Sequence, residues 1–320
     1  MSNSTSAENP STAAGRSPLL WVALGLLGLV LGYFLFIHSA YPTGLKTVAN
    51  WCWHAWNGKN DMLHGRAIPV IFGVMAYLGW KKAKGEPVAQ ANWGLVLVVF
   101  AITLYVLSAR TLQPRLALFG IPFLIIGGLL YLFGTKVTRH FVFPAFFWYF
   151  AIPVPGIQQA TALLQVVVTK LCYQAGTLCG MSLMVQGNTI SAVGENAWKF
   201  DIAEGCSGVR SLMALAMIAA IYANYTQKSL WKKAFLFASA LPLALVGNFG
   251  RIFTILILAH FGFEDFAGKT YHDWAGMLIF FPIALSGLFA IDRLLNPRPK
   301  KKLRRATQNK SEPLSESPTS

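Results

Sequence analysis

Charged residues are scarce in this chain. Asp, Glu, Lys and Arg make up 12% of its 320 residues, whereas a soluble globular protein carries about 25%. Hydrophobic residues make up 55% of the chain, and they gather in long uncharged runs. This composition excludes an ordinary soluble domain and predicts a polytopic membrane protein.

Negative charge is scarcer still, with 12 acidic against 27 basic residues and a net charge of +15. The basic residues fall in short clusters between apolar runs. That distribution is typical of the positive-inside rule of membrane proteins. We therefore predict a lipid bilayer as the surroundings of this chain, and no nucleic-acid partner.

The chain has four cysteines, and none stands in a CxxC or Cys/His spacing. The sequence therefore predicts no zinc site, no other metal and no cofactor. Cys172 and Cys179 would lie about 10.5 Å apart along one helix, which is too far for a disulfide. These two and Cys52 are interpreted as small buried hydrophobes. Cys206 is the cysteine in a polar setting.

The apolar runs predict an all-α fold with about eight transmembrane helices, because a span needs about 20 apolar residues. The seventh run is long and contains Pro242 and a polar stretch, 247–251, that we expect to break it. The expected spans are 18–37, 67–80, 92–109, 115–133, 140–154, 207–226, 232–260 and 274–292.

The two ends of the chain are polar. Residues 1–17 lack the basic segment and cleavage site of a signal peptide, and we expect them to be disordered. Residues 296–320 form a basic tail that we also expect to be disordered. One transmembrane domain, residues 18–295, is expected between them. Both ends should be cytoplasmic, because the tail shares its side with three basic loops, which hold Lys81, Lys82 and Lys84; Lys136 and Arg139; and Lys228, Lys232 and Lys233.

That orientation requires residues 155–205 to stay outside throughout. The run 157–185 is apolar but holds several Gln residues and a Lys, which favours an amphipathic helix at the outer interface over a ninth span. Residues 186–203 combine β-formers with Gly-Asn and Gly-Glu-Asn turns, and they predict a small β-hairpin on the outer face.

Three polar groups are expected at the outer ends of spans. Cys206 stands at the entry of the sixth span, where free N–H groups and a nearby cation such as Arg210 lower a thiol pKa. Arg251 has Asn248 three residues earlier on the same helical face, and its guanidinium could hold a carboxylate or a developing oxyanion. His272, at the start of the last span, could act as a general base.

Each of these groups also has a structural interpretation. Cys206 could be a buried structural cysteine, Arg251 a snorkelling arginine, and His272 an aromatic-belt histidine. Their common depth in the membrane favours a thiol acyl-transferase, in which the base activates the thiol and the cation holds the oxyanion.

The sequence resembles the exosortase/archaeosortase family of integral membrane transpeptidases. Three motifs carry the resemblance: EGCSGVRSL at 204–212, NFGRI at 248–252, and His272 before the last span. A fourth stretch, DMLHGRAIP at 61–69, is similar to the family's D-x-x-[small]-H-G-x-x-I-P segment but has Leu63 where Ser is usual.

The resemblance implies a catalytic triad of Cys206, Arg251 and His272. It implies a bacterial inner-membrane enzyme whose active site faces outward. Its substrates would be exported proteins with a C-terminal tail made of a short motif such as PEP, an apolar helix and a basic cluster. The cut protein would pass through a thioester to a surface acceptor, of glycan or lipid-linked type.

Several roles stay open at this stage. Asp61 and His64 could position substrate or cap the second span, and Glu204 and Ser207 could tune the thiol or cap the helix. Arg210 rivals Arg251 for the oxyanion. The competing function is a non-catalytic membrane component of exopolysaccharide or lipid-carrier export; a third candidate is a family member that binds sorting tails without cutting them.

Overall fold

A computed structural model of the chain describes residues 22, 25–26, 28–30, 32–38, 41, 47–57, 62–153, 156–194, 197–202 and 209–297. The predictions for residues 1–17, for the tail beyond 297, and for Asp61, Glu204, Cys206 and Ser207 therefore lie outside the described residues. The backbone of His272 is described, but its side chain is not.

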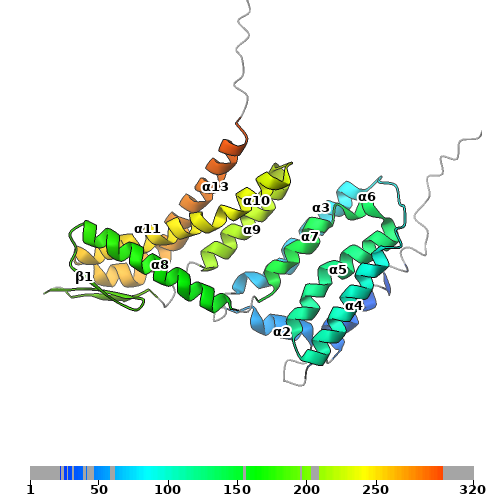
Figure 1. The fold of residues 1–320 in the computed structure, drawn as a ribbon, viewed down its shortest axis with the longest axis horizontal. Coiled ribbons are helices and arrows are strands. Elements are labelled where there is room, and N and C mark those ends of the chain that lie inside the picture. The colour runs from blue at the N-terminus through cyan, green and yellow to red at the C-terminus, as the bar shows by residue number, and fades with distance from the viewer. Residues whose placement is uncertain are drawn as a thin grey trace, which may run out of the picture.

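The described helices form two groups, which lie side by side in Figure 1. The first group holds η1 (Tyr33–Ile37), α2 (Val48–Ala55), η3 (Leu63–Arg66), α3 (Ile68–Ala83), α4 (Gly94–Thr111), α5 (Pro114–Phe133), α6 (Thr135–Thr138), α7 (Val142–Phe147) and η4 (Trp148–Ala151). The second holds α8 (Ile157–Leu178), β1 (Leu183–Gln186), β2 (Thr189–Ala192), β3 (Lys199–Asp201), α9 (Val209–Thr226), α10 (Leu230–Ala238), α11 (Ala240–His260), η5 (Phe266–Tyr271), α12 (His272–Ala275), η6 (Gly276–Phe280) and α13 (Phe281–Leu295).

The chain is mostly helical, as predicted, and carries apolar helices of membrane-spanning length. Among the described residues four are long and apolar enough to cross a bilayer: Gly94–Thr111, Pro114–Phe133, Leu230–His260 and Leu278–Leu295. Gly28–Ile37 and Val142–Ala151 are apolar but shorter. The predicted number of eight spans is thus not confirmed.

The predicted break in the seventh span is misplaced. The interruption falls at Ser239, between α10 and α11, and α11 runs unbroken through 247–251. Pro242 lacks a backbone N–H and crowds the preceding turn, so it suits the first turn of α11 and interrupts the helix before it. Gly247 and Asn248 are instead buried within α11.

The expected hairpin is part of a larger sheet. β1 and β2 pair antiparallel around the Gly187-Asn188 turn, so the hairpin begins earlier than the sequence indicated. β2 also pairs antiparallel with β3, which makes a three-stranded sheet with Ile190 opposite Phe200. α8 precedes the sheet and is not among the four candidate spans; its interfacial position stays a prediction.

Two of the apolar clusters that hold the helices together include buried residues of α9. Small residues of α9, α11 and α13, such as Ala219, Ala244 and Ala284, pack with Leu288 and let these helices approach closely. On another face of α9, Met217 packs with residues of the first group, including Ile68 and Phe147. α9 therefore joins the two groups of helices.

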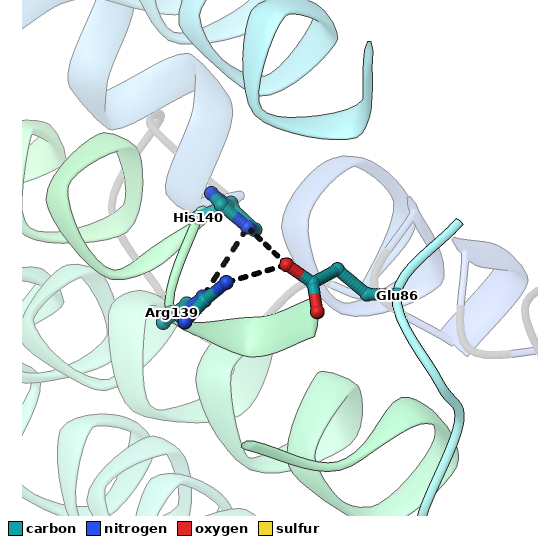
Figure 2. Close-up of polar contacts among 3 residues, drawn as sticks. All are labelled: Glu86, Arg139 and His140. Atoms are coloured by element: carbon teal, nitrogen blue, oxygen red, sulfur yellow. Dashed lines mark hydrogen bonds and ion pairs between the residues drawn. The ribbon is translucent and has the colours of Figure 1, made fainter. Parts of the chain in front are cut away.

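Three of the basic loops meet at one end of the molecule. The ammonium of Lys82, at the end of α3, lies 5.0 Å from the ring centre of Tyr225, at the end of α9. Arg139 donates a hydrogen bond to Glu86, and His140 Nε2 lies 3.5 Å from the same carboxylate oxygen; Figure 2 shows both side chains directed toward Glu86. This grouping is the one that the positive-inside pattern requires.

Candidate functional site

A small pocket brings together residues from two of the sequence motifs and from the last helix. Its polar wall consists of Ser211 on α9 with Asn248 and Arg251 on α11, and Gly276 of η6 closes one side. The pocket has a volume of about 10 Å³, which is enough for about one water molecule. Its remaining lining is Leu215, Ala244, Gly247, Phe280, Phe281 and Ala284.

Arg251 packs directly against Gly276. A Cβ atom added at position 276 would lie 3.0 Å from Arg251 Cζ and 3.1 Å from its Nε and Nη1. The last helix thus presents bare backbone to the guanidinium group. Asn248 and Arg251, three residues apart on the continuous helix α11, both line this pocket.

The helix around His272 is held against the same part of α11. The hydroxyl of Tyr271 donates a hydrogen bond to Thr254 Oγ1 at 3.0 Å. Tyr271 directly precedes His272, and Thr254 lies about one helical turn after Arg251 on α11. Gly276 follows His272 by one turn. The π-helical segments η5 and η6 flank α12 on both sides, and such segments occur frequently at functional sites. In the chain, His272 therefore lies between Tyr271 and Gly276, which both contact α11.

The pocket lies far from the basic end. Arg251 and Gly276 are about 30 Å along their helices from Leu230 and Leu295, at 1.5 Å per residue. The hydrocarbon core of a bilayer is also about 30 Å thick. The pocket, and Arg251 with it, is thus separated from the basic loops by about one membrane thickness.

The sheet covers the part of α11 beyond the pocket. Ile202, which follows β3, is buried in one cluster with Ile252, the neighbour of Arg251. A Cβ atom at Gly268, in η5, would lie 2.9 Å from Phe200 Cε1 of β3. The strand that leads toward Cys206 and the helix that leads to His272 are therefore packed against each other.

The other cysteines match their structural interpretation in part. Cys52 and Cys172 are buried, as predicted, but Cys179 is exposed at the end of α8. Burial raises the pKa of Cys52 to about 12, which keeps that thiol protonated at neutral pH and unsuited to nucleophilic attack. Among the described residues no group of three His, Cys, Asp or Glu side chains could hold a metal ion.

His64 and the nearby Trp56 are both hydrogen-bonded to η4, within the first group of helices. His64 Nε2 donates to the backbone oxygen of Phe150 at 3.2 Å, and Trp56 Nε1 donates to that of Ala151 at 2.7 Å. The carbonyl groups at the end of η4 have no partner within that short helix, and these two donors supply one for each. The geometry favours the structural role for His64, while Leu63 is exposed.

The two candidate arginines differ in their surroundings. Arg210 is exposed at the start of α9, whereas Arg251 is half-buried and lines the pocket. The sequence analysis did not single out Ser211 or Gly276. Gly276 could have been noticed as a small residue one turn after His272 on an apolar helix.

The chain belongs to the transmembrane exosortase family. A family model described as transmembrane exosortase (Exosortase_EpsH) matches residues 56–290, a range that contains all the pocket residues. No curated protein and no solved structure gives a significant match. Family membership, together with the apolar helices, makes this a multi-pass membrane protein and supports a transpeptidase-type role.

Proposed function

We propose that this protein is a membrane cysteine transpeptidase that cleaves C-terminal sorting tails of exported proteins at the outer face of the bacterial inner membrane. The observation that carries the proposal is the pocket in which Arg251 meets Ser211, five residues after Cys206, and Gly276, one turn after His272. The depth of this pocket, about 30 Å from the basic end, supports placing the chemistry at the outer boundary.

In the proposed reaction, His272 takes the proton of the Cys206 thiol, and the thiolate attacks the scissile carbonyl carbon. The oxyanion that forms accepts hydrogen bonds from the Arg251 guanidinium, which its half-buried position strengthens. The C–N bond breaks, His272 gives its proton to the leaving amine, and a thioester remains on Cys206. An acceptor nucleophile then attacks the thioester, loses its proton to His272 and restores the thiol.

The substrate tail is recognised by the same topology that orients the enzyme. An apolar helix followed by basic residues lies across the membrane with its basic end inside. Its other end, where the short motif stands, then reaches the depth of Arg251. The acceptor on the cell surface is of glycan or lipid-linked type.

The test is processing of a reporter protein that carries such a tail, from the same genome, followed by immunoblot. We expect a shortened band with the wild type and none with Cys206→Ala. Cys179→Ala is the matched control, because Cys179 is exposed and lies outside the pocket; it should process normally. Equal processing by Cys206→Ala would remove the thiol mechanism and favour a non-catalytic role in polysaccharide or lipid-carrier export.

A further inference from the structure

We propose that Gly276 is a positioning residue for Arg251, because the absence of a side chain at position 276 sets where the guanidinium group lies in the pocket. The inference deepens the proposed function, and its effect on activity rests on that function. The contact itself can be tested without any activity.

The distances define how the two residues meet. A Cβ atom at position 276 would be closest to Cζ, at 3.0 Å, and equally distant from Nε and Nη1, at 3.1 Å. An approach to the edge of the guanidinium would bring the nitrogens nearer than the central carbon. Gly276 therefore packs on the flat face of Arg251. Because the N–H groups lie in the plane, this packing directs the donor edges away from Gly276.

A methyl group at this position would leave too little room. A separation of 3.0–3.1 Å is tighter than the ordinary van der Waals range of 3.4–4 Å, so the guanidinium would have to move by a few tenths of an ångström. Ser211 and Asn248 line the same pocket, so a guanidinium that moves away from position 276 changes its place relative to both. A misplacement of about 1 Å at a catalytic group can cost about a hundredfold in rate.

The position of Gly276 in the chain gives the contact a second effect. His272 begins α12, and Gly276 begins η6 directly after it. The same stretch of helix thus carries the proposed base and the surface on which the proposed oxyanion donor rests. A shift of this helix along α11 would move both His272 and the surface that contacts Arg251. A close fit at Gly276 therefore fixes the position of His272 relative to Arg251.

The contact is tested by a double-mutant cycle on the full-length protein in detergent, with thermal unfolding as the readout. Gly276→Ala should lower Tm in the wild-type background and leave it unchanged or higher in Arg251→Ala, where the guanidinium is gone. An equal decrease in both backgrounds would overturn the proposal. Gly287→Ala is the matched control: its Cβ would lie 2.6 Å from Leu243 Cδ2, so its effect should not depend on Arg251.

The consequence for activity is tested by pulse–chase of the tailed reporter. We expect Gly276→Ala to lengthen the processing half-time about threefold to tenfold at an equal amount of folded enzyme, and a higher reporter level should not restore it. Gly120→Ala, whose Cβ would lie 3.2 Å from Ala101 O in the first group of helices, should process at the wild-type rate. Normal processing by Gly276→Ala would refute the positioning role. If Cys206→Ala processes as well as the wild type, the proposed function fails instead, and the stability cycle still decides the contact.

Discussion

The ring of Phe200 lies against the backbone of Gly268. The two residues belong to β3 and η5, and a Cβ atom at position 268 would stand 2.9 Å from Phe200 Cε1. β3 precedes the Cys206 motif and η5 precedes His272. This contact joins the segment that leads to the proposed nucleophile with the segment that leads to the proposed base.

Removing the contact of Phe200 with Gly268 should slow processing. Phe200→Ala removes the ring and leaves both segments less restrained, so we expect about a tenfold lower rate of reporter cleavage and a lower Tm. Lys199→Ala changes an exposed neighbour in the same strand and should behave as the wild type. Pulse–chase with thermal unfolding of both variants measures the two effects; wild-type processing by Phe200→Ala would show that the sheet is not needed for the site.

The two arginines should respond differently to a change that keeps the charge. Arg251→Lys loses the planar fork of donors, and removal of an oxyanion donor costs about 10²–10³ in rate. Arg210→Lys alters an exposed side chain and should retain activity. The measurement is the processing half-time of each variant, and the reverse ranking would assign the oxyanion role to Arg210.

The side of the membrane that Cys206 faces can be read by thiol labelling. In a Cys179→Ser background the other two cysteines, Cys52 and Cys172, are buried and should stay unlabelled. A membrane-impermeant maleimide should then label Cys206 in spheroplasts whose inner membrane is intact, and Cys206→Ala should abolish the signal. Labelling that requires permeabilised membranes would invert the proposed orientation.

His64 should matter for stability and not for catalysis. His64→Ala removes its hydrogen bond to Phe150 O and should cost about 1 kcal/mol of unfolding free energy, with cleavage per folded molecule unchanged. His54→Ala, which changes an exposed histidine on α2, is the control and should have little effect. A loss of cleavage in His64→Ala at unchanged stability would favour the substrate-positioning role instead.

The Glu86 cluster at the basic end predicts a pH dependence. The hydrogen bond from Arg139, with a smaller contribution from His140, holds the pKa of the Glu86 carboxyl below its ordinary value of 4.5. A lowered pKa means that the ionised form stabilises the fold above pH 4.5, and that this contribution disappears as the pH falls through the lowered pKa. Glu86→Gln should therefore lower Tm at pH 7, by a few degrees at most because the pair is near the surface, and the difference from the wild type should be smaller at pH 3. An equal decrease at both values would contradict the charge interaction.

The composition and the order of residues determined the class of this protein. Scarce charge and clustered lysines predict membrane helices, because burying charge in hydrocarbon is costly, and the structure brings three basic loops to one end through Lys82, Tyr225, Glu86 and Arg139. The motifs around Cys206, Arg251 and His272 indicate the family, which the match over residues 56–290 confirms. Composition, basic clusters and short motifs are properties of the local sequence or sums over the chain. They can therefore be read without knowing how the helices pack.

Tertiary structure decided the rest. Whether 247–251 interrupts a helix depended on its packing against the last helix, where Gly247 and Gly250 face Phe280. The contact of Phe200 with Gly268 joins residues about seventy positions apart. Likewise, only the way α9, α11 and η6 pack shows that Ser211, Arg251 and Gly276 share a pocket, because helix periodicity assigns a residue to a face and leaves open what that face meets.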